Sequence, residues 1–207
     1  GDVYKRQILT GCYPNRLGIS GAFGPNSKKG INPDELLLSE MLKNNDYKTG
    51  IFGKWHLGDA EKFMPTNHGF DEFYGILFSN DMWPYHPEFP DAYPKDLLLY
   101  RNTEPVEALI DQSDLTKNIT DESIRFIDEN KDNQFFLYIA HPQPHVPLFA
   151  SKEFDGSTGK GLFADVITEI DFSVGRIIDA IEKNGLSGNT IVAVSYTHLR
   201  AHETSYD

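Results

Sequence analysis

The run FFLYIA at residues 135–140 restricts the fold of this 207-residue chain more than any other stretch. A short apolar run without polar alternation is typical of a strand buried on both faces, which is the pattern of parallel sheets. A second such run, TIVAV, occupies residues 190–194. Apolar residues at helical spacing precede the two runs, at residues 114–130 and 160–184, and Gly185 marks the end of the second helix. Helices that alternate with buried strands predict an α/β fold with a mostly parallel sheet.

Two further elements extend this pattern toward the N-terminus. Asn32 and Glu35 frame a capping-box-like start of a helix, with Pro33 in its first turn. A strand is predicted at residues 47–52. The aromatic and proline-rich residues 82–105 show no period and predict an ordered surface excursion whose rings pack upon one another. The alternative for these rings is stacking on sugars.

Composition restricts the class of partner. The chain has 19 basic and 31 acidic residues and a formal charge of −12, which argues against a nucleic acid because phosphate contacts need clustered Lys and Arg. A small anion is still compatible, since a local basic pocket can sit in an acidic protein. The single cysteine, Cys12, rules out an internal disulfide framework. No apolar run reaches the length of a membrane span, and no signal peptide is visible.

The predicted strand at 47–52 continues into GIFGKWHLG, residues 50–58, where a lysine and a histidine stand two positions apart. Residues i and i+2 of an extended segment point to the same face, so Lys54 and His56 would lie side by side while Trp55 turns into packing. An ammonium and an imidazole suit an anionic group, the first as a point charge and the second as a hydrogen-bond donor or proton carrier. The alternative is a surface turn with a solvated lysine and histidine.

A second candidate loop follows the apolar run at 135–140 and reads HPQPHVP, residues 141–147. In open α/β sheets, ligands bind beyond the carboxyl ends of the strands. Three prolines fix this loop and leave little entropy to lose when a ligand is held. Its position at the carboxyl end of a strand and its rigidity therefore favour a ligand-binding loop.

These stretches resemble the signatures of one family and follow the order in which that family has them. The similarity is to formylglycine-dependent sulfatases of the arylsulfatase A and N-acetylgalactosamine-6-sulfatase type, in LTGCYPNRLG at 9–18, GKWHLG at 53–58, the segment 64–79 with its GFDEFYG, and PHVP at 144–147. GKWHLG with a downstream PHxP is fairly specific, whereas either alone is weak. The resemblance implies an alkaline phosphatase-like sandwich, with a mostly parallel central sheet flanked by helices, of which this chain would carry an incomplete part.

The resemblance also implies roles for particular side chains. Lys54 would neutralise charge on the sulfate and the leaving oxygen, and His56 would hydrogen-bond the formylglycine diol and act as base in its breakdown. His145, and not His141, would donate to the ester oxygen as general acid or sulfate binder. Ser79 would lie near the sulfate, the alternative being a turn-capping hydroxyl. Lys54, His56 and His145 are expected to converge on one tetrahedral anion.

The implied reaction is hydrolysis of a sulfate ester, in a sulfated carbohydrate or an aryl sulfate, by attack of a hydrated formylglycine on sulfur. Calcium would polarise the sulfate oxygens. No residue of this chain is assigned to the metal, because the family's downstream Asp and Asn have no counterpart after Ser195, where the frame breaks. A formylglycine-generating enzyme or its equivalent would mature the full-length protein. A periplasmic or extracellular location is expected from the family.

Cys12 lies in CYPNR, which is close to the family's C-x-P-S-R, whose cysteine becomes formylglycine. The family's Leu-Thr-Gly follows that cysteine, but here it precedes Cys12, so Cys12 is interpreted as a half-buried thiol and not as the nucleophile. Residues 1–7 and 196–207 are predicted to be non-native terminal remnants around a partial sulfatase catalytic domain at 8–195. Such a fragment, expressed alone, is expected to be inactive.

Two other functions fit the same residues. A phosphoryl or phosphonate monoester hydrolase of the alkaline phosphatase superfamily would share the sheet and the metal site. A non-catalytic sulfatase-like domain that binds anionic glycans would share the fold, but the intact Lys54, His56 and His145 argue against decay at the site.

Overall fold

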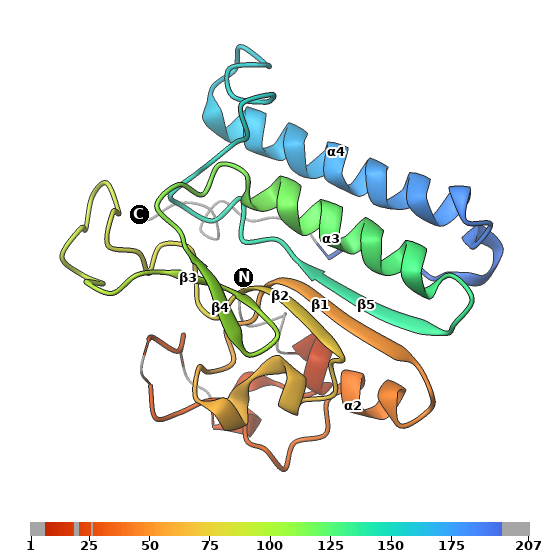
Figure 1. Ribbon diagram of the computed structural model, residues 1–207. Helices are drawn as coiled ribbons and strands as arrows, with labels where there is room; N and C mark the ends of the chain where they lie inside the picture. The colour runs from red at the N-terminus through yellow and green to blue at the C-terminus, as the bar shows by residue number, and fades with distance from the viewer. Residues whose placement is uncertain (1–6, 19–20, 26, 196–207) are drawn as a thin grey trace. The chain divides into compact units, whose positions relative to one another are not determined.

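The computed structural model describes residues 7–18, 21–25 and 27–195 (Figure 1). These residues divide into two compact units. The first unit runs to Ile110 and takes in Asn133–Ala140, and the second comprises Asp111–Asp132 and the described residues from His141 onward.

The first unit contains a five-stranded sheet in the order β4-β3-β2-β1-β5. Its strands are β1 Lys48–Lys54, β2 Glu72–Ile76, β3 Leu98–Arg101, β4 Glu104–Ala108 and β5 Phe135–Ala140. β1 lies parallel to both β2 and β5, whereas β3 and β4 run antiparallel. The strands predicted at 47–52 and 135–140 are therefore neighbours in a parallel core. This confirms the α/β prediction and brings the carboxyl ends of these strands to one edge of the sheet.

The helical elements include α2 Leu38–Lys43, α3 Leu115–Asn130 and α4 Leu162–Lys183, with short turns η1 Pro14–Leu17, η2 Glu61–Phe63, η3 Pro65–Asn67 and η4 Ser187–Asn189. α3 and α4 confirm the two predicted amphipathic helices and pack side by side within the second unit (Figure 1). Thr120 meets Ser173 and, further along both helices, Asp128 meets Asn184, so the two helices run in the same direction. Gly185 ends α4 as predicted, with a left-handed φ of 72°.

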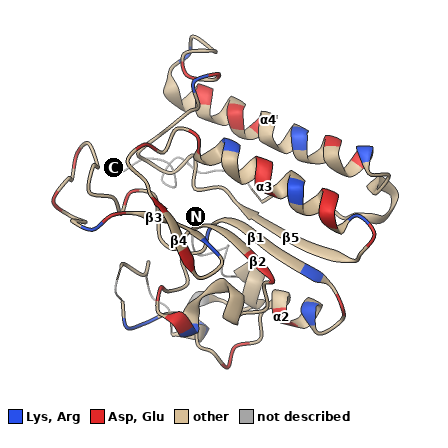
Figure 2. Cartoon of the chain, viewed as in Figure 1, with Lys and Arg blue, Asp and Glu red and all other residues tan. Residues whose placement is uncertain are grey.

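The charged side chains of α3 and α4 are of mixed sign (Figure 2). Lys117 pairs with Asp121 one turn along α3, and Arg176 of α4 donates to the same carboxylate at 2.8 Å. Exposed pairs of this kind each contribute little stability. On these two helices Lys117, Arg125 and Arg176 are each paired with an acidic neighbour and do not form a continuous basic face.

The helix predicted from Asn32 begins later, at Leu38. Asn32 Oδ1 accepts the N–H of Asp34, which closes a turn and not a helix end. The helix start that does form is supported by Glu40, whose carboxylate accepts the N–H of Leu37 at 2.8 Å. An Asn side chain that accepts the N–H two residues ahead stabilises a turn in place of a helix start. The predicted helix start at Asn32 was therefore wrong.

The strand predicted at residues 190–194 is wrong, because this stretch is irregular and Ile191 is 96% exposed. β5 was predicted to be buried on both faces, yet residues 135–139 are only half-buried and the strand stands at the end of the sheet order. An apolar run becomes a buried strand only beside another strand, and none of the described strands pairs with 190–194. Residues 1–6 and 196–207, which make up most of the predicted terminal remnants, lie outside the described part.

The excursion predicted for residues 82–105 contains the start of a hairpin, β3 and β4, that the sequence prediction missed. The turn is made at Asn102, whose φ is 55°. Its Oδ1 accepts the N–H of Phe73 and its own N–H donates to the carbonyl of Phe73, so the turn is tied to β2. β4 is exposed along its whole length and contains Pro105, so no apolar alternation indicated it.

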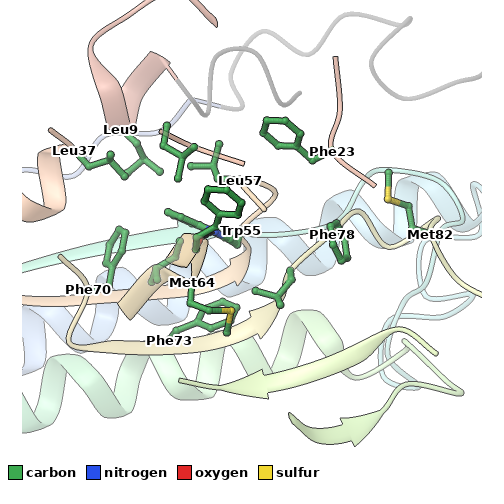
Figure 3. Packing of buried hydrophobic residues seen from close by; sticks show 14 residues of the cluster. Leu9, Phe23, Leu37, Trp55, Leu57, Met64, Phe70, Phe73, Phe78 and Met82 are labelled. Atoms are coloured by element: carbon green, nitrogen blue, oxygen red, sulfur yellow. Dashed lines mark hydrogen bonds between the residues drawn. The ribbon is translucent and has the colours of Figure 1, made fainter. Parts of the chain in front are cut away.

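The hydrophobic core of the first unit surrounds the residues that follow β1 (Figure 3). Trp55 is 3% exposed, and its indole N–H donates to a backbone carbonyl at the end of η2. The ring of Phe70 meets Trp55 edge-on, with 6.1 Å between centroids, and stacks on Phe136 of β5. Trp55 and Leu57 are both buried and flank His56 in the sequence, so their packing fixes the backbone that carries this histidine.

His68 is a buried ring beside this core. Its centroid lies 6.1 Å from that of Trp55, and its Nε2 donates to the carbonyl of Lys62 at 3.2 Å. Burial lowers the pKa of His68 below the usual 6.5, and the charge of Glu40 and the bond to Lys62 oppose this shift only in part.

The lowered pKa of His68 predicts a loss of stability on acidification. The unfolded chain binds more protons than the folded chain between pH 6.5 and the lower folded pKa, so the contribution of His68 is present above pH 6.5 and falls as pH decreases through this window. We expect the free energy of unfolding of His68→Gln, measured by urea denaturation, to depend less steeply on pH than that of the wild type as the pH is lowered below 6.5. Equal slopes would contradict this assignment.

The strands β2, β1 and β5 approach one another closely at Gly53. A methyl group on Gly53 would overlap the carbonyl of Ala140 in β5, and one on Gly75 in β2 would overlap the carbonyl of Gly53. Gly53 also has a φ of 117°, a region that residues with side chains rarely adopt. The parallel core therefore requires glycine at this point.

Gly53→Ala should lower the free energy of unfolding by about 3 kcal/mol or more, because overpacking against backbone and positive-φ strain both add to the folded state. The matched control is Gly175→Ala in α4, where an added methyl group meets nothing within 4 Å. The control should raise stability by about 0.5–1 kcal/mol, the helical preference of alanine over glycine. Chemical denaturation measures both, and a Gly53→Ala protein as stable as the wild type would refute the close approach.

Candidate active site

Lys54 is the last residue of β1 and is 4% exposed. Its Nζ donates to the hydroxyl of Ser79 at 3.0 Å. The chain beyond β1 stays beside the chain beyond β2, because the N–H groups of Trp55 and His56 donate to the carbonyls of residues 76–77. Parallel pairing thus carries Ser79, from the loop after β2, to the ammonium at the end of β1.

Lys54 and Ser79 form a pair of hydrogen-bond donors. The ammonium has three N–H donors, one of which is directed at Ser79, and the serine hydroxyl that accepts it keeps its own proton for a further acceptor. Ser79 is 2% exposed, so both groups lie away from bulk water, where contacts to an anion are stronger. The pair can present a point charge and a neutral donor to the same oxyanion.

His56 is 3% exposed and has a φ of 59°. Its Nε2 lies 2.9 Å from the carbonyl of Phe23, which can only accept, so Nε2 carries a proton. In the neutral ring the lone pair is then on Nδ1, which makes Nδ1 the atom that can take up a proton. The ring also meets Phe78 edge-on, with 6.5 Å between centroids.

The strand alternation that was expected to place Lys54 and His56 side by side ends at Lys54. β1 stops there, and the left-handed backbone of His56 breaks the period of two. Trp55 does turn into the core as predicted. A positive φ in a histidine is uncommon, and strained backbone of this kind clusters at functional sites.

His145 belongs to the second unit and is half-buried. Its Nδ1 donates to the carbonyl of Val146 at 2.7 Å, and its N–H donates to the carbonyl of Pro142. The amide of Gln143 spans the loop to the carbonyl of Pro147 at 3.3 Å. Because Nδ1 carries a proton, donation from the opposite nitrogen, Nε2, requires the charged imidazolium.

A stripe of buried polar side chains on α4, Asp165, Glu169 and Ser173, bonds to the start of the loop that carries His145 and to the chain after it. These residues stand four apart and are 2–3% exposed. Asp165 accepts the N–H groups of Gly156 and Thr158 and the hydroxyl of Thr158. Glu169 accepts the N–H of residue 151 at 2.9 Å. The stripe therefore anchors the chain segment 151–158, which leads away from His145.

The two carboxylates of this stripe have opposite pKa shifts. The hydroxyl and N–H of Thr158 hold the pKa of Asp165 below its usual value, because they bond the charged form. Burial raises the pKa of Glu169, and the bonds from Ser151 offset this only in part. Asp165 therefore stabilises the fold above its ordinary pKa, whereas ionised Glu169 reduces stability as pH rises.

His141, at the start of the loop, is 4% exposed and bonds to the other end of the stripe. The hydroxyl of Thr120 uses its single proton to donate to the carbonyl of Thr116. In the hydrogen bond between Thr120 and Ser173, the hydroxyl of Ser173 is therefore the donor. The hydroxyl of Ser173 must then accept from Nε2 of His141, 3.2 Å away. This chain of bonds ties the first residue of the loop to both helices.

The sequence prediction did not identify this stripe. Its signal was present, because Asp165 and Glu169 fall on the helix face that continues as the buried Ile177 and Ile181. Carboxylates on the apolar face of a helix are buried, and buried carboxylates need partners.

The described residues contain no group of three or more His, Cys, Asp or Glu side chains that could hold a metal ion. Cys12 is half-buried, and its N–H donates to the hydroxyl of Thr10 at 3.2 Å. Among the described helices, none has both the length and the apolar character needed to cross a membrane.

The sequence model of the Sulfatase family matches residues 5–204, nearly the whole chain. The chain belongs to the sulfatase family, as the motifs predicted. The five-stranded sheet with its parallel core is the alkaline phosphatase-like α/β fold expected of that family.

Relatives support this assignment. The arylsulfatase of Hemicentrotus pulcherrimus is 36% identical over 203 residues, which cover 91% of this chain and 36% of that protein. The N-acetylgalactosamine-6-sulfatase of Mus musculus is 34% identical over 207 residues, which cover 91% of this chain and 39% of that protein. The crystal structure of Ps i-CgsB in complex with k-i-k-neocarrahexaose matches with a TM-score of 0.75 and 29% identity, over 91% of this chain and 46% of that one. The chain thus spans less than half the length of the relatives it matches.

Asp165→Ala should loosen the segment that follows the His145 loop. Removal of the carboxylate leaves the N–H groups of Gly156 and Thr158 without their acceptor, so their amide hydrogens should exchange with solvent faster than in the wild type. The matched control is Asp171→Ala on the exposed face of the same helix, which should leave these rates unchanged. Hydrogen exchange by NMR measures both, and equal rates in Asp165→Ala and the wild type would contradict the anchoring role.

Proposed function

We propose that this chain carries part of the active site of a sulfatase that hydrolyses sulfate esters of sugars. The observation that carries the proposal is the contact between Lys54 and Ser79 at the carboxyl ends of parallel strands. Ligands of α/β sheets bind at this edge. A buried ammonium with a neighbouring hydroxyl suits a tetrahedral anion that bears charge on several oxygens.

In the proposed reaction Lys54 binds the sulfate and offsets negative charge that develops on the leaving oxygen. Ser79 donates its hydroxyl proton to a sulfate oxygen while it accepts from Lys54. These two roles require no change of protonation, so the pair is ready to act before substrate arrives.

The two histidines have complementary roles in this proposal. His56 would act in its neutral form with Nδ1 as the proton acceptor, because its Nε2 donates to the carbonyl of Phe23. His145 would act in its charged form and donate from Nε2 to the ester oxygen, because its Nδ1 donates to the carbonyl of Val146. That His145 acts on the same anion as Lys54 remains a prediction, since the two residues belong to different units.

Formylglycine and calcium belong to the proposal for the whole protein as the family's cofactors. Calcium would supply electrophilic stabilisation of the sulfate oxygens. The described residues contain no cluster of three or more His, Cys, Asp or Glu side chains, and no step above passes through calcium. A formylglycine-generating enzyme is the proposed maturation partner.

The proposed substrates are sulfated carbohydrates. Supporting this are the similarity to an N-acetylgalactosamine-6-sulfatase and the similarity to a structure that contains a neocarrahexaose. A periplasmic or extracellular location is proposed as well, because sulfated polysaccharides occur outside the cytoplasm.

Lys54→Met tests the proposal in a protein that extends this chain to the full length of its relatives. We expect kcat/KM for a chromogenic aryl sulfate to fall about 10²–10³-fold, the effect of removing one preorganised charge contact. Thermal stability should not fall, because a buried ammonium is replaced by an apolar side chain of similar length. The control is Lys48→Met at the exposed start of the same strand, which should retain full activity.

The same assay distinguishes the alternative chemistries. Hydrolysis of a phosphate monoester faster than of the matched sulfate ester would favour a phosphoryl hydrolase. Binding of inorganic sulfate without turnover of either ester would favour a non-catalytic glycan-binding domain. A Lys54→Met enzyme with wild-type activity would refute the proposed site.

A further inference from the structure

The segment that follows Ser79 is wound tightly. The N–H of Met82 bonds to the carbonyl of Ser79, that of Trp83 to Asp81, and that of His86 to Trp83. Six residues wound in such turns span about 12 Å, against about 20 Å when extended. The backbone of residue 85 is therefore kept within about 12 Å of the backbone of Ser79, so a sugar whose sulfate is bound by Ser79 can extend to it.

Two of the aromatic residues in this segment are anchors. Trp83 is 5% exposed, and its indole N–H donates to the carbonyl of Leu109 at 2.7 Å. His86 is also 5% exposed, and its Nδ1 accepts the N–H groups of Glu88 and Phe89 at 3.1 Å. These bonds hold the segment to the sheet and fix the turn that follows.

The other two rings are held outward against the anchors. Tyr85 is 52% exposed and meets the buried ring of Trp83, with 5.4 Å between centroids. Phe89 is 53% exposed and meets the ring of His86 at 5.3 Å. Each exposed ring therefore has one face or edge fixed by a buried ring, which lowers the entropy that it would lose on binding. The rings of this segment do pack upon one another, as predicted, but Tyr85 and Phe89 also remain about half exposed.

We propose that Tyr85 and Phe89 form a stacking subsite for the sugar ring that carries the sulfate. This subsite rests on the proposed function, because it places the sugar by means of the sulfate bound at Lys54. An exposed aromatic face binds the apolar C–H face of a pyranose, and the tyrosine hydroxyl adds a polar contact at the edge of the ring.

The charge of the same segment restricts the sugar further. Residues 82–97 contain the acidic Glu88, Asp91 and Asp96 but only one basic residue, Lys95. A second sulfate on the stacked ring would be bound by a segment of net negative charge, which disfavours it relative to an uncharged ring. The subsite therefore selects a monosulfated, otherwise neutral sugar.

The test is a titration of the whole 207-residue chain followed by tryptophan fluorescence, to which Trp83 contributes beside Tyr85. Galactose 6-sulfate should bind about tenfold more tightly than inorganic sulfate, as expected for one or two added aromatic contacts. Tyr85→Ala and Phe89→Ala should each weaken binding of galactose 6-sulfate about threefold to tenfold and leave binding of inorganic sulfate unchanged. Tyr85→Phe, which keeps the ring, should stay within about twofold of the wild type.

The matched control is Phe172→Ala on α4, which removes a ring that is 49% exposed and lies 5.3 Å from Phe154. It should change neither affinity. Galactose 2,6-disulfate should bind no more tightly than galactose 6-sulfate.

The outcomes separate this inference from the proposed function. If Tyr85→Ala and Phe89→Ala bind galactose 6-sulfate as the wild type does, the stacking subsite is refuted and the anion site stands. If Lys54→Met binds inorganic sulfate unchanged, the anion site is refuted. Tighter binding of the disulfate refutes the selection for a neutral ring, and binding of neither sulfate nor sugar sulfate refutes both sites.

Discussion

The approach of three strands at Gly53 is the constraint on which the rest of the first unit depends. Gly53 is paired with Gly75 on one side and Ala140 on the other, and an added methyl group at either glycine would overlap a neighbouring carbonyl. The register of a parallel sheet is thereby fixed at one row. Lys54 is the first residue beyond that row, so its position follows from the packing of backbone against backbone and not from its own contacts.

Beyond this row the chain leaves β1 and β2 as paired loops, and two different forces hold them. Trp55 and Leu57 are drawn into the core, while backbone bonds from residues 55–56 to residues 76–77 keep the loops side by side. The apolar residues favour burial, and the polar Lys54 and His56 between them are buried as a consequence. Hydrophobic packing therefore offsets the free-energy cost of removing these two candidate site residues from water.

Much of this could be predicted from the sequence, because apolar periodicity and short motifs are local signals. The parallel strands at 47–52 and 135–140 and the helices α3 and α4 followed from pattern alone. The run at 190–194 did not become a strand, since burial depends on neighbours that no local pattern specifies. The contact between Lys54 and Ser79 spans 25 residues, and the resemblance to a family, rather than spacing, suggested that both belong to one site.

In both candidate histidines, a backbone hydrogen bond determines which ring nitrogen carries the proton. From sequence, each imidazole is a proton carrier in which either ring nitrogen can hold the proton of the neutral form. In the fold, a backbone carbonyl holds the Nε2 proton of His56 and another holds the Nδ1 proton of His145. Since a carbonyl can only accept, the nitrogen that contacts it must carry a proton. In the neutral ring the other nitrogen is then the acceptor, and it can donate only when the ring is charged. His56 can serve as a base while neutral, but His145 can serve as an acid only when charged, so opposite protonation states are required of two residues of the same type.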